Sequence, residues 1–250
     1  MPLNSKIKNF LLNNNFLLIH LETVESTMKE IKKYIGKKNI CMIADQQSAG
    51  IGRRGNEWIS PKGNIYLSFL LEYNLSIEDH FIFNALTANS IIEFLNRYIS
   101  KNINIKWPND ININNNKIAG IITEIVEKNG IKYIIIGLGI NILKSPKLID
   151  YQTCCLKDYT SNIKYENLIL DMIEAYFTEY EMIINKSYNE IFNKYKNKMT
   201  NLGSKINILL PNGEKQKVLL KNLNYDGSLL IEYNGKEKNI FSARIINDIN

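Results

Sequence analysis

Residues 81–98 constrain the fold of this chain more than any other segment, because apolar side chains surround most of their helical wheel. A helix that is apolar nearly all round has to be buried on almost every side. Segments with the alternating pattern of strands lie before and after it, at residues 65–71, 103–106, 117–126 and 132–142. We therefore predict that a core helix at residues 81–98 packs against a mixed β-sheet.

Other helices are expected to back the same sheet. Thr27 followed by Glu30 fits a capping box, so a helix is predicted to begin there and to end at Gly36. Two more helices are predicted at residues 166–184 and 188–199, where apolar residues recur at helical spacing. The sequence up to about residue 200 thus predicts one α+β unit.

After residue 200 the pattern changes to short strands separated by turns rich in glycine and asparagine. Such a series predicts a separate small β-barrel of roughly fifty residues. We therefore divide the chain into a larger domain at residues 1–200 and a small C-terminal β-barrel domain at residues 201–250. The predicted strands of the barrel are residues 205–210, 215–221, 228–233 and 237–241.

The composition excludes several classes of protein. With 45% hydrophobic and 22% charged residues in a chain of 250, the protein is expected to fold and to stay in solution. Residues 1–15 contain no signal-peptide core and no spanning helix, so we expect a cytoplasmic protein with no membrane partner. The formal net charge of +6 is spread along the chain, which argues against a dedicated nucleic-acid surface.

Cysteine and histidine are too scarce for several kinds of chemistry. The three cysteines are an odd number, and the neighbours Cys154 and Cys155 could pair only under strain, so reduced thiols are expected. The two histidines, His20 and His80, lie in no metal-ligand spacing with each other or with a cysteine. Histidine-based metal sites and Ser-His-Asp catalysis are therefore not expected.

Residues 49–55, Ala-Gly-Ile-Gly-Arg-Arg-Gly, place three glycines around two adjacent arginines, between strand candidates at 41–44 and 65–71. Glycine lets a backbone approach a ligand closely, and guanidinium groups with free amides bind phosphate or carboxylate oxygens. The spacing matches neither the Walker phosphate loop nor the Rossmann fingerprint. A loop that only connects two strands is the alternative, but the polar residues before it and Trp58 after it favour an anion-binding site.

Two further clusters bring polar groups to a turn and to the start of a strand. Residues 106–110, Lys-Trp-Pro-Asn-Asp, form a turn in which Asp110 could hold Mg²⁺ beside phosphates, a purely structural turn being the alternative. Lys117 opens a strand beside the small residues Ala119 and Gly120, which leave room for a ligand. A lone lysine in such a place is more often simply solvated.

The fourth cluster is Gly-Leu-Gly-Ile-Asn at residues 137–141, where two glycines interrupt an apolar strand. Glycine weakens a strand, and we expect no gain in packing to offset that loss here. A ligand that approaches the strand closely, or a β-bulge, would explain both glycines, with Asn141 as a polar contact.

Taken in order, the four clusters resemble those of the biotin–protein ligases, also called biotin–[acetyl-CoA-carboxylase] ligases. The resemblance begins at residues 25–27, Glu-Ser-Thr, and continues into the C-terminal strands, so it covers nearly the whole chain. It implies a mixed β-sheet backed by helices, of the class II aminoacyl-tRNA-synthetase-like type, followed by an SH3-like β-barrel. It also implies an enzyme that joins biotin to ATP as biotinyl-5′-AMP and transfers biotin to a lysine of a biotin carboxyl carrier domain.

The resemblance implies a role for each matching residue. Catalysis would depend on Lys117, Arg53 and Asp110, the last of which would lie near the phosphates or hold Mg²⁺. The reaction would require ATP and Mg²⁺ but no tightly bound metal. The biotin contacts would be Ser26, Thr27, Met28, Gln47, Gly50, Ile51, Gly52, Arg53, Lys117 and Gly120, and the ATP or adenylate contacts Arg53, Arg54, Trp58, Asn109, Lys117 and Asn141.

Adenylation agrees with these residue types, because cations and amides that align two anions can supply most of the catalysis without a protein nucleophile. Helix capping would explain Ser26 and Thr27 equally well, and one helix N-terminus can serve both purposes. Ile51 stands where the family's loop usually has its first arginine, so the role of that side chain is not carried over. About 25 residues precede Ser26, and we therefore expect no N-terminal DNA-binding domain and no DNA partner.

Two rival functions remain open. One is a lipoate/octanoate–protein ligase of the same fold. The other is a non-enzymatic nucleic-acid-binding protein whose barrel uses Tyr225 and Tyr233 to stack bases. A long exposed strand could also join two copies edge to edge as a homodimer.

Overall fold

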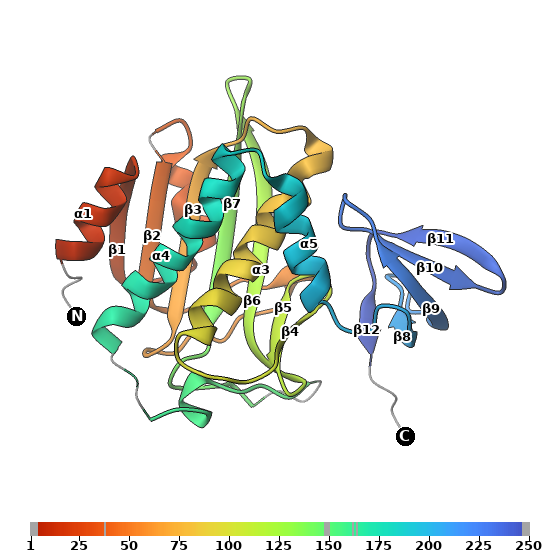
Figure 1. Ribbon diagram of the computed structural model, residues 1–250. Coiled ribbons are helices and arrows are strands. Elements are labelled where there is room, and N and C mark those ends of the chain that lie inside the picture. The colour runs from red at the N-terminus through yellow and green to blue at the C-terminus, as the bar shows by residue number, and fades with distance from the viewer. Residues whose placement is uncertain (1–4, 38, 148–150, 162, 164, 247–250) are drawn as a thin grey trace.

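The computed structural model describes residues 5–37, 39–147, 151–161, 163 and 165–246 of the chain (Figure 1). Seven strands form one mixed sheet in the order β1-β2-β3-β7-β6-β5-β4. Only β1 and β2 run parallel in it, and the other neighbouring pairs run antiparallel. The strands are β1 Phe16–Val24, β2 Asn39–Gln47, β3 Ile65–Glu72, β4 Ile103–Lys106, β5 Asp110–Ile113, β6 Asn116–Lys128 and β7 Ile131–Ile140.

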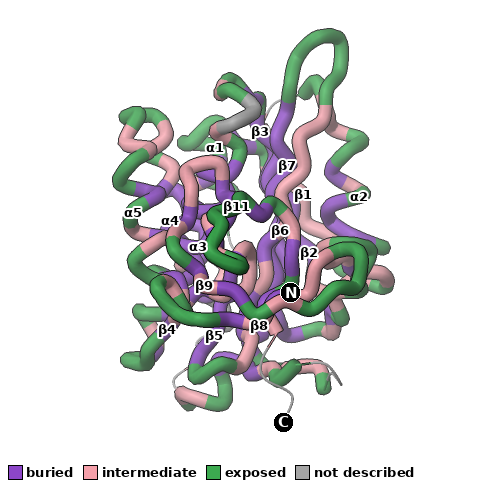
Figure 2. The backbone as a smooth tube through the Cα atoms, turned by 90° about the vertical axis from the view of Figure 1, so that its right-hand side faces the viewer, coloured by how far each residue is buried: buried purple, intermediate pink, exposed green. Residues whose placement is uncertain are grey.

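Helices cover one face of this sheet, and the main hydrophobic core lies between the two layers (Figure 1). The backing helices are α1 Ser5–Asn13, α3 Phe81–Asn96, α4 Tyr165–Ile184 and α5 Tyr188–Lys198. As its apolar wheel predicts, α3 is buried along almost its whole length (Figure 2). The buried hydroxyls of Thr87 and Ser90 donate to carbonyl oxygens one turn earlier in α3, so they carry no unpaired polar group into the core.

The opposite face of the sheet carries a short helix, α2 Thr27–Glu30, which continues as a 3₁₀ turn at Ile31–Tyr34. Side chains alternate between the two faces of a strand. Accordingly Ile40 and Met42 of β2 pack with Met28 under α2, whereas Cys41 and Ile43 belong to the main core. The loop between β2 and β3 also lies on the α2 side of the sheet, where Trp58 lies against β7.

A second sheet follows α5 and contains five antiparallel strands in the order β11-β10-β9-β8-β12. It contacts the larger unit through the turn before β10. The indole Nε1 of Trp107 donates a hydrogen bond of 2.8 Å to the Gly227 carbonyl, and a Cβ atom on Gly227 would lie 2.3 Å from the Phe81 ring. The strands are β8 Lys205–Leu209, β9 Lys215–Leu223, β10 Leu229–Tyr233, β11 Lys236–Ile240 and β12 Arg244–Ile246.

The mixed sheet backed by helices and the second small antiparallel sheet confirm the predicted fold class. Among the described α-helices and strands, those not predicted are α1, β1, β5 and β12. The edge strand β1 has no clean alternation of buried and exposed residues, which removes the signal that identifies a strand. Among the described residues, no helix has both the length and the apolar character needed to cross a membrane.

Candidate active site

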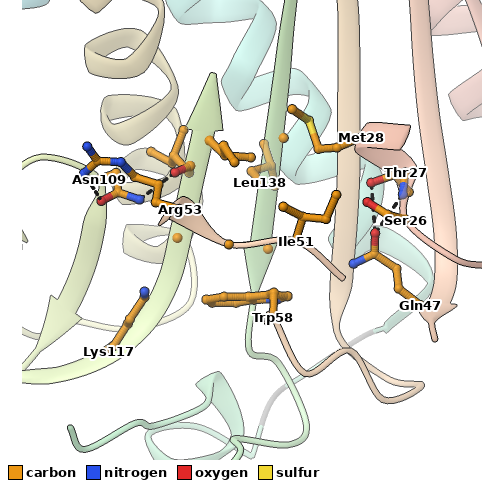
Figure 3. A pocket seen from close by; sticks show the side chains of 16 residues that line it. Ser26, Thr27, Met28, Gln47, Ile51, Arg53, Trp58, Asn109, Lys117 and Leu138 are labelled. Atoms are coloured by element: carbon orange, nitrogen blue, oxygen red, sulfur yellow. Dashed lines mark hydrogen bonds between the residues drawn. The ribbon is translucent and has the colours of Figure 1, made fainter. Parts of the chain in front are cut away.

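A cavity lies on the α2 side of the sheet, between the arginine loop and the strands beneath it (Figure 3). Its empty volume is about 440 Å³, which includes space that is open to solvent. Its walls come from distant parts of the chain: α2, the end of β2, the arginine loop, β6 and β7. The lining residues are Ser26, Thr27, Met28, Gln47, Ile51, Gly52, Arg53, Trp58, Asn109, Lys117, Gly120, Ile121, Ile122, Gly137, Leu138 and Gly139.

The two glycines of β7 leave space for side chains as well as for a ligand. A Cβ atom on Gly137 would lie 2.6 Å from the sulfur of Met28, and one on Gly139 would lie 2.4 Å from Trp58 Nε1. The expectation that these glycines bring no gain in packing is therefore wrong. The suggested β-bulge is also absent, since β7 keeps an unbroken register with both β3 and β6.

The arginine loop is a narrow hairpin that its own backbone closes. Trp58 N donates to the Gly50 carbonyl at 2.9 Å, and Gly52 N donates to the Asn56 carbonyl at 2.7 Å. A Cβ atom on Gly50 would lie 2.3 Å from the Trp58 carbonyl oxygen, so only glycine fits there. Gly50 thus shapes the loop, and it does not line the cavity.

One end of the cavity carries neutral hydrogen-bonding groups. Gln47 Oε1 accepts from Thr27 N at 2.8 Å and from Thr27 Oγ1 at 3.1 Å. Ser68 Oγ donates to Thr27 Oγ1 at 2.8 Å, and Gln47 Nε2 donates to Ser60 Oγ at 2.8 Å. Ser26 is 1% exposed, and its hydroxyl has no hydrogen-bond partner within the described parts of the chain. A buried hydroxyl that faces a cavity without a partner is available to a ligand.

The predicted capping box at Thr27 and Glu30 is wrong. Ser26 is the N-cap residue, and its own side chain makes no capping hydrogen bond. The Thr27 hydroxyl is instead engaged by Gln47 and Ser68, which come from β2 and β3. These partners are 20 and 41 residues away in the sequence, so the local pattern alone could not reveal them.

The other end of the cavity is cationic. Lys117 Nζ lies 2.7 Å from Asp110 Oδ1, and it lies 5.1 Å from the ring centroid of Trp58 and 5.3 Å from that of Tyr151. Arg53 Nη1 donates to Asn109 Oδ1 at 3.2 Å. Burial lowers the pKa of Arg53, the neighbouring Arg54 lowers it further, and Asp110 opposes both effects. Such a partly desolvated set of cations favours an anionic ligand.

Three other predicted residues lie behind or beyond the cavity wall. Arg54 points to the second sheet, where its Nη2 donates to Ser242 Oγ at 2.6 Å and to the Ala243 carbonyl at 3.1 Å. Asp110 supports Lys117 from behind. Asn141 is 1% exposed, and its Nδ2 donates to the Cys154 carbonyl at 3.1 Å.

A second, smaller cavity adjoins the first and shares Trp58 and Lys117 with it. Sequence analysis did not single out Tyr151, which lies in a segment without a recognisable motif, or the apolar wall residues Ile121 and Ile122. No group of three His, Cys, Asp or Glu side chains that could hold a metal ion occurs in the described ranges of the chain. The second cavity is lined by Glu57, Trp58, Ile59, Lys117, Asn141, Pro146, Tyr151 and Thr153.

Comparison with known proteins shows that the chain is similar to known protein ligases. Residues 21–141 match the Biotin/lipoate A/B protein ligase family. The chain is 27% identical over 238 residues to the bifunctional ligase/repressor BirA of Bacillus subtilis, an alignment that covers 91% of this chain and 73% of that protein. It is 21% identical over 206 residues to the biotin–[acetyl-CoA-carboxylase] ligase of Mycobacterium tuberculosis, with 79% of this chain and 74% of that protein covered.

Solved structures agree with these relatives. The structure of a biotin protein ligase from Aquifex aeolicus in complex with biotin and ATP superposes with a TM-score of 0.73. The superposition covers 91% of this chain and 97% of that chain at 26% identity.

Proposed function

The chain belongs to the biotin/lipoate A/B protein ligase family, and from that premise we propose that it is a biotin–protein ligase. It joins biotin to ATP as biotinyl-5′-AMP with release of pyrophosphate, and then passes the biotinyl group to a lysine of a biotin carboxyl carrier domain with release of AMP. The observation that carries this proposal is the division of one cavity into a neutral polar end and a cationic end. Biotin has the same division, with an uncharged ureido ring at one end and a carboxylate at the other.

The neutral end recognises the ureido ring. Ser26 supplies a buried hydroxyl without a partner, and Thr27 is held in place by Gln47 and Ser68. Both lone pairs of Gln47 Oε1 are used by Thr27, so Gln47 offers a ligand only the Nε2 hydrogen that does not bond Ser60. Gln47 therefore acts first by orienting Thr27.

The middle of the cavity is apolar and suits the thioether ring and the alkyl chain of biotin. Met28 and Leu138 line the wall, and Ile51 reaches it from the arginine loop (Figure 3). Burying these carbon atoms against the ligand contributes about 25 cal/mol per Å² of apolar surface removed from water. Gly52 and Gly120 also line the cavity.

The cationic end carries out the activation step. A carboxylate oxygen of biotin attacks the α-phosphorus of ATP, the bond to the oxygen that bridges to the β-phosphate breaks, and pyrophosphate leaves. Lys117 and Arg53 lie where the carboxylate and the α-phosphate meet, and they stabilise the negative charge that builds up there. Because the nucleophile belongs to the substrate, no residue of the chain has to form a covalent intermediate.

Asp110 acts through its neighbours. Its carboxylate pairs with Lys117 and holds the ammonium group beside the cavity. One carboxylate close to a phosphate site also fits Mg²⁺ that arrives with ATP, because Mg²⁺ is usually held by one or two carboxylates together with phosphate oxygens. When bound, Mg²⁺ would neutralise phosphate charge there.

The nucleotide extends from the cationic end into the second cavity. Trp58 forms a wall common to both cavities and offers its ring face to the adenine. Asn109 is fixed by its bonds to Arg53 and to the Ile121 carbonyl, so it holds Arg53 towards the phosphates. Asn141 acts mainly by holding the wall of the second cavity, since its amide is already bonded to Cys154.

Exchange of labelled pyrophosphate into ATP tests this function. We expect the purified protein to catalyse exchange that depends on biotin and not on lipoate or octanoate. Absence of biotin-dependent exchange in a folded sample would overturn the proposal, and exchange that depends on lipoate would identify the rival ligase of the same fold. Transfer is tested separately by mass spectrometry, with the carrier domain of an acetyl-CoA carboxylase as acceptor and a lipoyl domain as control.

A further inference from the structure

The segment at residues 151–156 lies beside the start of β6 and is joined to it by one β-bridge. Lys117 N donates to the Gln152 carbonyl, and Cys154 N donates to the Lys117 carbonyl, each at 3.0 Å. These two bonds form an isolated parallel bridge between Lys117 and Thr153. Both the N–H group and the carbonyl group of Lys117 are thus bonded to this segment.

The register of that bridge fixes which side chains face the site. Side chains two residues apart along an extended segment point to the same side, and Tyr151 and Thr153 do line the second cavity together. The Cys154 thiol points the other way, towards the Asn116 carbonyl. Tyr151 therefore faces Lys117 because the backbone bonds of Lys117 itself set the register.

Asn141 locks the segment in this register. Its side-chain Nδ2 donates to the Cys154 carbonyl at 3.1 Å, and its own carbonyl accepts from Leu156 N at 3.0 Å. A buried amide that joins the end of β7 to this segment prevents the segment from sliding along β6. The contact between Tyr151 and Lys117 consequently has a rigid support.

The Lys117 ammonium group lies near two aromatic rings, with centroid distances of 5.1 Å to Trp58 and 5.3 Å to Tyr151. Both distances are within the range at which a cation is attracted to a ring face. Asp110 is its third neighbour, at 2.7 Å. A ring face attracts the charge but does not neutralise it, whereas the carboxylate forms an ion pair that competes with any anionic substrate.

We propose that Tyr151 is a positioning residue whose ring, together with that of Trp58, keeps the Lys117 ammonium group at the junction of the two cavities. The inference deepens the proposed ligase function and depends on it. When the carboxylate and phosphate oxygens draw Lys117 away from Asp110, the two rings hold the ammonium group in place. Tyr151 thus lowers the cost of exchanging one anionic partner for another at the reacting centre.

Three variants test the proposal in the pyrophosphate-exchange assay. Tyr151→Leu removes the ring, Tyr151→Phe keeps it, and Tyr233→Leu is the control, since Tyr151 and Tyr233 are both 37% exposed. We expect Tyr151→Leu to lower kcat by about fivefold to tenfold, the size of one cation–π contact, with KM for ATP and biotin little changed. Tyr151→Phe should keep most of the activity, and Tyr233→Leu all of it.

Each other outcome contradicts the proposal. Normal kcat in Tyr151→Leu would show that the ring does nothing for Lys117. A raised KM for ATP at unchanged kcat would show that the ring contacts the nucleotide instead. Equal losses in Tyr151→Leu and Tyr151→Phe would assign the effect to the hydroxyl group.

A second measurement does not depend on activity. In protein with ¹³C-labelled lysine, the Lys117 ε-methylene protons, assigned with Lys117→Arg, should be shifted upfield by the two rings. They should move downfield in Tyr151→Leu and stay in Tyr151→Phe. An unshifted Lys117 signal in the unmodified protein would overturn the proposed contact with the aromatic rings. A shifted signal together with no biotin-dependent exchange would overturn only the proposed function.

Discussion

The two ends of the cavity are built by different means. At the neutral end, hydrogen bonds within the protein fix Thr27 through Gln47 and Ser68, and one hydroxyl, that of Ser26, is left over. At the cationic end, Lys117 is held by an ion pair, which can yield to an anion, and by two ring faces. The first end is suited to recognise a shape, and the second is suited to exchange partners during a reaction.

The same strand serves both ends. Gly137 gives Met28 its place beside the neutral end, and Gly139, two residues on, gives Trp58 its place at the cationic end. One β-strand thus sets the distance between recognition and activation. Changes at the two ends should therefore have separable effects on ligand binding and on catalysis.

Lys117→Ala should have the largest effect on the reaction rate, and it tests the cationic end of the cavity most strongly. Loss of a charge-stabilising donor at a reacting centre typically lowers the rate by on the order of a hundredfold or more, and we expect this loss in biotin-dependent pyrophosphate exchange. The fold should persist, because Asp110 is 28% exposed and water can solvate it. Lys205→Ala, at the exposed first residue of β8, is the matched control, and a near-normal rate in Lys117→Ala would remove this lysine from the reaction.

Gly139→Ala and Gly137→Ala form a matched pair on β7. Overpacking costs about 1–3 kcal/mol, and the rigid Trp58 ring can yield less than the flexible end of Met28. We therefore expect Gly139→Ala to raise KM for ATP by roughly tenfold or more, and Gly137→Ala to weaken mainly biotin binding, by less. Steady-state kinetics measures KM for ATP, and calorimetry measures biotin binding. If Gly139→Ala weakened mainly biotin binding and Gly137→Ala weakened mainly ATP binding, the division of the cavity into two ends would be contradicted.

Ser26→Ala should weaken biotin binding by about tenfold or less, the size of one neutral hydrogen bond. The free energy of unfolding should not fall, because the lost hydroxyl has no partner within the described residues. Ser68→Ala is the contrasting variant, since its hydroxyl donates to Thr27, and it should lower stability in urea unfolding. Unchanged biotin affinity in Ser26→Ala would show that the hydroxyl is not a ligand contact.

Arg54→Ala should have the smallest effect, less than about threefold on exchange, because one exposed hydrogen-bonding side chain contributes little. Its guanidinium group contacts Ser242 and Ala243 and not the cavity. A loss as large as that in Arg53→Ala would mean that Arg54 turns into the site when ligands bind. In that case the cationic end would include both arginines.

Regular elements with strong periodicity could be predicted from the sequence. The apolar wheel of residues 81–98 and the alternating pattern of residues 65–71 depend on neighbours along the chain, and the helix α3 and the strand β3 were both found. The four clusters also converge on one cavity, as expected from their residue types. Local pattern was sufficient wherever local contacts decide the structure.

Local pattern failed wherever a distant side chain decides. Thr27 was interpreted as a cap because its partners Gln47 and Ser68 are far along the chain. The two glycines of β7 were expected to bring no gain in packing, because their sequence neighbours do not show that the side chains of Met28 and Trp58 lie against them. Tyr151 was missed because nothing near it in sequence shows that its segment pairs with Lys117.

Calorimetric titration with biotin and with its uncharged methyl ester tests the division of the cavity most directly. Ser26→Ala should weaken the binding of both ligands by the same factor, because both carry the ureido ring. Lys117→Ala should weaken the binding of biotin and leave that of the ester unchanged, because only biotin carries the carboxylate. Equal losses for both ligands in Lys117→Ala, or no loss for either in Ser26→Ala, would contradict the account.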